Sequence, residues 1–247
     1  MLDPFIKRVD LADGGFAFQV ERARAERMTA ALASLPGMRT PTLLDADPAT
    51  GTLFFERLET MAPLHAGLRA HWFERAGTLL AHIHRSLELP AELTRDRPED
   101  AGRQGTVYVH GDYMPNNLAI VGADLVVFDW GLRPWGQRDY TRASPAVDLT
   151  AFIAPWLVPR WWDPRLPVRS LRRFLDAWRE GIGPKSASAQ LAGASLEDAF
   201  GEHVRYNSAA VARRRGPRRA VLGVKTAVNT WLTRQAVLGR ALAREEA

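Results

Sequence analysis

The stretch that decides the fold is VYVHGDYMPNNLAIVGADLVVFDW, residues 107–130. Short apolar runs rich in β-branched residues alternate here with Gly, Pro and Asn, a composition typical of strands joined by turns. We therefore predict a strand ending in His110, a polar loop at 111–117, and a hairpin formed by strands 118–121 and 125–128.

The turn of this hairpin determines which polar side chains lie together. If residues 122–124 form a three-residue loop, continuing the ladder places Asn117 opposite Asp129. Directly opposed residues share one face of a sheet, with Cβ atoms about 5 Å apart. Asp112 lies in the loop that leads into the hairpin, and such oxygen ligands suit Mg²⁺ bound to phosphate. The register predicts a magnesium–phosphate site; the alternative is a surface hairpin whose Asn and Asp only form turns.

The spacing of these polar residues follows a phosphotransfer motif. His110, Asp112 and Asn117 form H-x-D-x-x-x-x-N, and the tripeptide Asp-Trp-Gly follows at 129–131. Protein kinases carry H-R-D-x-x-x-x-N and D-F-G. With His-Gly-Asp in place of His-Arg-Asp, the chain resembles the aminoglycoside phosphotransferase and choline kinase group of small-molecule kinases, over roughly residues 7–152.

The resemblance implies an α+β, protein-kinase-like fold with two lobes. A reduced N-terminal β lobe, residues 1–60, would cover the nucleotide, and a mainly helical C-terminal lobe, residues 61–247, would hold the catalytic loop and the acceptor pocket. It also implies ATP and Mg²⁺ as cofactors. The expected reaction is transfer of the γ-phosphoryl group to a hydroxyl, or less favourably an amine, of a small molecule.

The resemblance also implies a role for each motif residue. Asp112 would be the catalytic base, and Asn117 and Asp129 would bind the metal. His110 would pack beneath the catalytic loop. Asp148 would brace that loop, with a plain helix N-cap as an equal alternative.

In the small lobe, Lys7 would contact ATP phosphates and pair with Glu26 on a helix, while Glu56 and Leu58 would lie in a hinge beside the adenine. The chain has three lysines among 33 basic residues, and Lys and Arg are not interchangeable at a phosphate site. Ordinary surface charge is the alternative for Lys7 and for Glu26.

One departure from the family pattern concerns the glycine-rich loop, because only six residues precede Lys7. Either the small lobe is trimmed, or the start is placed too late, or Asp-Gly-Gly at 13–15 is the phosphate-covering turn. In the last case 16–20 is the strand on which the lysine is expected, and Gln19 or Arg22 replaces it.

Hydrophobic periodicity places the remaining elements. We expect strands at 5–9, 42–45 and 52–56, and helices at about 21–35, 63–87, 168–181, 196–211 and 220–244.

After the Asp-Trp-Gly tripeptide, Arg133 and Arg138 are candidates to contact an anionic acceptor or phosphate.

Composition narrows the class of protein further. The 247 residues, 46% hydrophobic, suffice for one large or two-lobed domain, and the lack of cysteine excludes disulfides and thiol chemistry. No apolar run approaches the ~18 residues of a membrane span, so we expect a soluble, cytoplasmic protein without a membrane partner. Basic residues crowd the last fifth of the chain, but no nucleic-acid motif accompanies them, so we expect a solvated helix face and no nucleic-acid partner.

Two other functions stay open. The missing glycine-rich loop motivates a non-catalytic, nucleotide-binding pseudokinase of the same fold. The pair Gly111-Asp112 with a nearby His and Asn motivates a metal-dependent phosphoesterase, which is less favoured because such centres use more His and Asp ligands than are visible.

Overall fold

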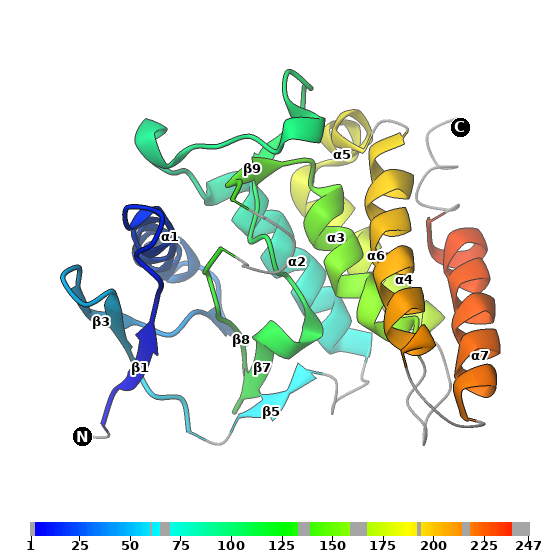
Figure 1. Cartoon of the computed structure of the whole chain (residues 1–247), viewed down its shortest axis with the longest axis horizontal. Helices are drawn as coiled ribbons and strands as arrows, with labels where there is room; N and C mark the ends of the chain where they lie inside the picture. The colour runs from blue at the N-terminus through cyan, green and yellow to red at the C-terminus, as the bar shows by residue number, and fades with distance from the viewer. Residues whose placement is uncertain are drawn as a thin grey trace.

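The computed structural model describes residues 3–59, 61–64, 70–132, 139–158, 167–191, 194–213 and 218–238. It has the expected α+β architecture, with small sheets toward the N-terminal side and a larger helical body on the other (Figure 1). One hydrophobic cluster runs through both parts and includes Phe18, Leu53, Phe73 and Phe152.

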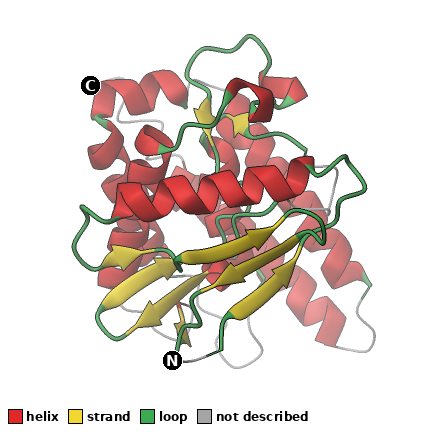
Figure 2. Ribbon diagram, turned by 90° about the vertical axis from the view of Figure 1, so that its left-hand side faces the viewer, coloured by secondary structure: helices red, strands yellow, loops and turns green. Residues whose placement is uncertain are grey.

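The first sheet has the order β1-β4-β3, with β1 at Phe5–Arg8, β3 at Leu43–Asp47 and β4 at Thr52–Phe55. The strands predicted at 42–45 and 52–56 are present as β3 and β4, which pair antiparallel, and Lys7 pairs with Leu53 across β1 and β4. Helix α1, Phe16–Leu32, lies alongside the strands of this part of the molecule (Figure 2).

The predicted strand at 16–20 is wrong, because α1 already begins at Phe16. Gly14 and Gly15 have φ values of 72° and 81°, and the Asp13 carboxylate accepts a hydrogen bond from the Ala17 N–H at 3.0 Å. The alternation of apolar residues at 16, 18 and 20 resembled a strand, but all three are buried within the first helical turns. Gln19 and Arg22 are therefore helical, and neither replaces Lys7 on a strand.

The second sheet has the order β2-β8-β7-β5, formed by Met38–Arg39, Asp124–Val127, Leu118–Val121 and Ala62–Pro63. Pro63 pairs with Ala119, so the helix predicted to begin at Pro63 does not begin there. Because proline lacks an N–H, it is tolerated in an edge strand such as β5.

The hairpin between β7 and β8 differs from the prediction by one residue. Val121 pairs with Asp124, so the loop is the two-residue Gly122-Ala123, and Gly122 has a φ of 60°. Two-residue hairpin loops match the twist of the strands when the first loop residue has positive φ, which favours glycine there. As a result Asn117 lies opposite Phe128, whose N–H donates to the Asn117 carbonyl at 3.1 Å.

The helical body is organised around α2 and α4, at Ala70–Ser86 and Val168–Ile182. These helices pack closely at glycines: a Cβ on Gly77 of α2 would overlap the Phe174 carbonyl, and one on Gly181 of α4 would lie 2.6 Å from the Ala81 Cβ. A short antiparallel pair, β6 (Val107–Tyr108) and β9 (Arg142–Ala143), joins the segment before His110 to the segment before α3.

The other helices are α3 (Ala146–Ile153), α5 (Pro184–Gln190), α6 (Ala194–Ala212) and α7 (Arg218–Thr233). Single turns lie at Ala91–Leu93, Pro98–Asp100, Pro115–Asn117, Ala154–Trp156 and Arg234–Leu238. Within the described ranges, no helix has the length and apolarity needed to cross a bilayer.

Candidate active site

Asp112 and Asn117 lie in contact within the loop that precedes β7. The Asn117 amide nitrogen donates to the Asp112 carboxylate at 2.6 Å and to the Asp112 backbone carbonyl at 2.9 Å. Pro115 starts the short turn that carries Asn117, as suits a residue without an N–H. Because the amide nitrogen of Asn117 is turned toward Asp112, the amide oxygen of Asn117 points away from Asp112 and is the atom that can accept a hydrogen bond or bind a cation.

Asp129 follows β8 and has left-handed backbone geometry, with a φ of 66°, the one positive φ among the described non-glycine residues. An extended residue here would project to the face opposite its neighbour Phe128. The left-handed conformation interrupts that alternation, and the Asp129 carboxylate accepts a hydrogen bond from the Lys7 ammonium at 2.5 Å. Such outliers are held in place where the surroundings over-determine them, often at functional sites.

The helical partner of Lys7 is Glu21, and the predicted pairing with Glu26 is wrong. The Lys7 ammonium lies 2.5 Å from the buried Glu21 carboxylate, whereas Glu26 pairs with Arg22 at 2.8 Å near solvent. Glu21 shares one face of α1 with the buried residues at 25, 28 and 32. That helical spacing is a signal in the sequence for Glu21, since it places Glu21 on the same face as the apolar residues.

Burial and neighbouring charge have opposite effects on the pKa values of Lys7 and Glu21. Burial by itself lowers the pKa of Lys7, but the carboxylates of Glu21 and Asp129 outweigh it, and the pKa is raised above its ordinary value. Burial raises the pKa of Glu21, against the pull of the Lys7 ammonium. Lys7 is therefore a firmly protonated cation at the junction of the small sheet, α1 and the end of β8.

Gly131 allows the close approach of this junction. A Cβ on Gly131 would lie 2.7 Å from the Glu21 Oε2 and 3.2 Å from the Lys7 Nζ. A Cβ atom essentially never lies within 3.0 Å of another heavy atom, so a side chain here would displace the ion pair.

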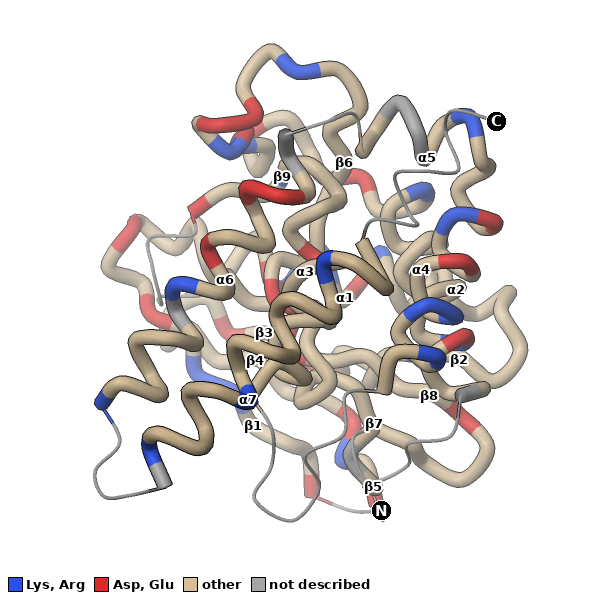
Figure 3. Tube along the Cα trace, turned by 90° about the vertical axis from the view of Figure 1, so that its right-hand side faces the viewer, with Lys and Arg blue, Asp and Glu red and all other residues tan. Residues whose placement is uncertain are grey.

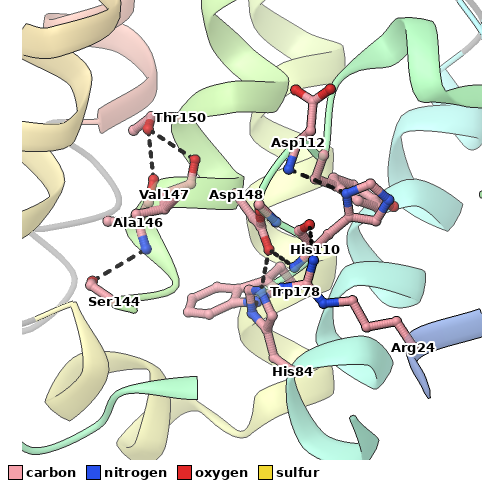
Figure 4. Close-up of polar contacts among 12 residues, drawn as sticks. Arg24, His84, His110, Asp112, Ser144, Ala146, Val147, Asp148, Thr150 and Trp178 are labelled. Atoms are coloured by element: carbon pink, nitrogen blue, oxygen red, sulfur yellow. Dashed lines mark hydrogen bonds and ion pairs between the residues drawn. The ribbon is translucent and has the colours of Figure 1, made fainter. Parts of the chain in front are cut away.

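Asp148 lies beneath the loop that contains His110 and Asp112, with its carboxylate fully buried. It accepts hydrogen bonds at 2.8 Å from the backbone N–H groups of His110 and Gly111, and from His84 Nε2 at 3.1 Å (Figure 4). Burial alone would raise the pKa of Asp148, but these hydrogen bonds and the neighbouring histidines hold it below its usual value. Of the two alternatives for Asp148, its contacts are those of a brace for the loop.

His110 is buried between aromatic rings. Its ring lies 4.6 Å from that of Trp130 and 5.7 Å from that of Tyr113, and its Nε2 lies 3.2 Å from the Phe128 carbonyl. Burial lowers the pKa of His110 to about 4, so the ring is neutral at physiological pH. A neutral Nε2–H donates to Phe128, leaving Nδ1 to accept from the Asp112 N–H at 3.3 Å.

Arg24, which the sequence reasoning missed, joins α1 to both halves of the site. Its side chain is fully buried, and it donates to the backbone carbonyls of Trp130 at 3.0 Å and His110 at 3.3 Å. Burial lowers its pKa to about 10, which still leaves it charged. A single arginine on α1 thus holds the catalytic loop against the residue after Asp129 (Figure 4).

The two residues predicted to lie beside the adenine are at the end of the small sheet. Glu56 pairs with Arg39 at 2.9 Å and accepts a hydrogen bond from the Thr42 hydroxyl, and Leu58 is partly buried. Contact of either residue with a nucleotide stays a prediction. Arg133 and Arg138 lie outside the described residues.

The donor set of the site fits Mg²⁺. Asn117 offers an amide oxygen, and Asp129 offers a carboxylate with a side chain 45% exposed. Mg²⁺ is typically held by one or two such groups together with phosphate oxygens and water. In the part of the chain that the structure describes, no group of three or more His, Cys, Asp or Glu is arranged to hold a metal.

A short two-lobed fold with a lysine–glutamate pair, a braced H-x-D-x-x-x-x-N loop and an Asp-Trp-Gly turn defines a protein-kinase-like phosphotransferase. The comparisons with known proteins agree. The model of the "Phosphotransferase enzyme family" matches residues 5–184. The match spans more than half of the chain, and the chain belongs to this family.

One solved structure of low sequence identity shares the fold, and a second is similar to this chain. A glucosamine kinase is 15% identical, with a TM-score of 0.53, over 87% of this chain and 70% of that one. A choline/ethanolamine kinase family protein from Mesorhizobium loti is 16% identical over 98% of this chain and 86% of that one, with a TM-score of 0.48.

One curated relative is longer than this chain. A probable bifunctional tRNA threonylcarbamoyladenosine biosynthesis protein of Haloquadratum walsbyi is 33% identical over 136 residues, which is 55% of this chain. The match spans 21% of that relative's length.

Proposed function

We propose that this protein transfers the γ-phosphoryl group of ATP to a hydroxyl, or less favourably an amine, of a small molecule. The observation that carries the proposal is the Asp112–Asn117 contact of 2.6 Å in a loop braced by the buried Asp148. Phosphoryl transfer depends mainly on positioning and on charge stabilisation, and a loop fixed at both its backbone and its carboxylate supplies positioning.

Asp112 is proposed as the catalytic base. Its carboxylate points away from His110 and Asp148 in Figure 4, whereas the polar groups of the brace are turned inward. In this role Asp112 accepts a hydrogen bond from the acceptor group, orients it toward the phosphorus and takes its proton. Asn117 limits the rotation of the Asp112 side chain.

Lys7, Asn117 and Asp129 are proposed to hold the nucleotide. Lys7 projects from β1, fixed by Glu21, and in this role its ammonium donates to phosphate oxygens. Asn117 and Asp129 would bind Mg²⁺, which supplies neutralisation of the triphosphate charge when it is bound. Glu56 and Leu58 are proposed to border the adenine, at the division between a nucleotide-covering lobe (1–60) and an acceptor-binding lobe (61–247).

The test is consumption of ATP with a panel of amino alcohols, sugars and aminoglycosides, in the presence of Mg²⁺. The proposal predicts acceptor-dependent formation of ADP and a phosphorylated product, absent in Asp112→Asn. Binding of ATP without transfer to any acceptor would favour a pseudokinase. Phosphate release from p-nitrophenyl phosphate without ATP would favour a phosphoesterase.

A further inference from the structure

Helix α7 has its polar side buried and its apolar side exposed. The inward-facing residues include Thr226, Asn229, Thr230 and Thr233, all at most 9% exposed. Most of their polar groups are hydrogen-bonded. The Thr226 and Thr230 hydroxyls donate to carbonyls of their own helix, and the Asn229 amide donates to the Leu157 carbonyl at 3.1 Å.

The outward side carries Val221, Val224, Val228 and Trp231, which are 47%, 66%, 49% and 60% exposed. Spacings of three, four and three residues place these four side chains on one face of the helix, and the exposed Ala220 and Ala227 extend that face. A contiguous exposed apolar surface of this kind marks an interaction site more often than a solvated face.

Basic residues border this apolar stripe, and acidic residues are absent from it. The sequence from His203 to Arg244 contains ten arginines and lysines and no aspartate or glutamate. Lys225 follows Val224 directly and lies beside the stripe. It is exposed, as are Arg219 and Arg234, and Arg234 pairs with Glu197 on α6 at 3.5 Å. In Figure 3, α7 runs across the foreground with blue segments along it and no red one.

A groove beside the stripe adds to the apolar surface. It has a volume of about 800 Å³ and lies between α6 and α7, lined by Val204, Val211, Ala227 and Trp231 with Arg219 and Arg234. Figure 1 shows α7 at the opposite side of the molecule from α1 and the small sheet. The stripe and groove are thus separate from the catalytic residues.

We propose that α7 binds an anionic lipid surface, with its valines and Trp231 in the headgroup region and its basic residues among the lipid charges. An apolar face with tryptophan, bordered by Lys and Arg, is the pattern of helices that lie in a membrane interface, and anionic lipids attract such basic residues. A second copy of this chain docked α7 to α7 would place like charges together, which disfavours it as the occupant. This binding is independent of phosphoryl transfer.

The test is co-sedimentation of the full chain with vesicles of phosphatidylcholine alone and of equal parts phosphatidylcholine and phosphatidylglycerol. The proposal predicts binding to the anionic vesicles about tenfold or more above the neutral ones, weakened by added salt. Val224→Ser with Trp231→Ser removes two exposed side chains and should abolish the binding. Lys225→Glu should weaken it several-fold.

Matched controls are present in the chain. Leu44 is 59% exposed on β3, and Lys185 is exposed on α5. Leu44→Ser and Lys185→Glu should leave vesicle binding unchanged, and thermal melting of every variant checks the fold. Equal binding to both vesicle types, absence of binding, or binding unaffected by the α7 variants overturns the proposal. So does a wild-type dimer that becomes monomeric in the Val224→Ser, Trp231→Ser variant without any vesicle binding.

Discussion

Asp112 shows how much of the site depends on a single short loop. Its carboxylate is oriented by Asn117, and the backbone preceding it is held by Asp148. Apart from Asp148, these residues are close together along the chain, so their spacing in the sequence was enough to identify them. The role of each residue is inferred from its side-chain chemistry, and single substitutions can test each role separately.

Asp112→Asn should lower kcat strongly while leaving the fold and nucleotide binding intact. The substitution keeps the size of the side chain and removes its ability to accept a proton, and general bases contribute about 10²- to 10⁴-fold to rate. We expect kcat to fall by that range, with ATP affinity unchanged in calorimetry. A kcat within a few-fold of the wild type would refute the role of Asp112 as base.

Glu21→Gln should lower kcat/KM for ATP about 100-fold, because misplacing a positioned group by about 1 Å costs roughly that much. Glu21 is buried against Lys7, whereas Glu26 is half-exposed and pairs with Arg22. Glu26→Gln is therefore the matched control, with steady-state parameters expected to equal the wild type. Similar losses in both variants, or in neither, would contradict the assignment of Glu21 as the partner of Lys7.

His110 should make stability fall as the solution is acidified. Its pKa is about 4 in the folded protein against 6.5 for an ordinary histidine. Below the ordinary value the unfolded chain takes up a proton on His110 that the folded chain does not, so stability present above pH 6.5 is lost progressively toward pH 4.

The magnitude of this loss is about 2 kcal/mol between about pH 7 and pH 5. Urea denaturation of the wild type and of His110→Asn at both pH values measures it, since the variant lacks this titration. The gap in unfolding free energy between the two proteins should narrow by about that amount on acidification. An unchanged gap would show that His110 is not held neutral by burial.

Glu21 and Arg24 are the site residues that sequence reasoning missed. Both are charged groups on a helix, and isolated charges of that kind are usually assigned to solvent. What buries them is contact with segments about 100 residues away, around Trp130 and Gly131. The local signal for both is helical phase: Glu21 lies four residues before Ala25, and Arg24 lies four residues before Met28, both of which are buried.

At the scale of elements, the three-residue hairpin loop, the strand at 16–20 and the helix from Pro63 were predicted incorrectly. In each case the sequence identified a turn or an apolar segment correctly, but the backbone conformation of that segment differed from the prediction. Gly122-Ala123 closes a tighter loop, α1 starts at the left-handed Gly15, and Pro63 is paired with Ala119 at a sheet edge. Backbone pairing of that kind leaves little trace in hydrophobic periodicity.

Gly131→Ala should impair nucleotide binding through the junction of β1, α1 and the end of β8. The new methyl group would lie 2.7 Å from Glu21 Oε2, so the Lys7–Glu21 pair must move. We expect a roughly tenfold or greater rise in KM for ATP, as for other small displacements of positioned groups.

Gly201→Ala provides the control for this substitution. Its Cβ would have only an ordinary contact, 3.6 Å from Arg205, in the middle of α6. That change should leave KM unaltered and not destabilise the helix. If Gly131→Ala binds ATP as tightly as the wild type, the close approach at Gly131 is not required for nucleotide binding.

At the scale of the whole molecule, the α+β class and the family followed from the motif at 107–131, and both are confirmed. The small sheet contains three strands, with Lys7 on the first of them. The exposed apolar side of α7 was not predicted, because the sequence of that helix alone shows amphipathicity without showing which side faces the protein.

The central claim is that Asp129, together with Asn117, holds a magnesium-bound triphosphate. Calorimetric titration of ATP with and without Mg²⁺ tests it in the wild type and in Asp129→Asn, a variant that tolerates the left-handed backbone. We predict that Mg²⁺ strengthens ATP binding by the wild type about tenfold or more and has little effect on the variant. An equal effect of Mg²⁺ on both proteins would contradict the account.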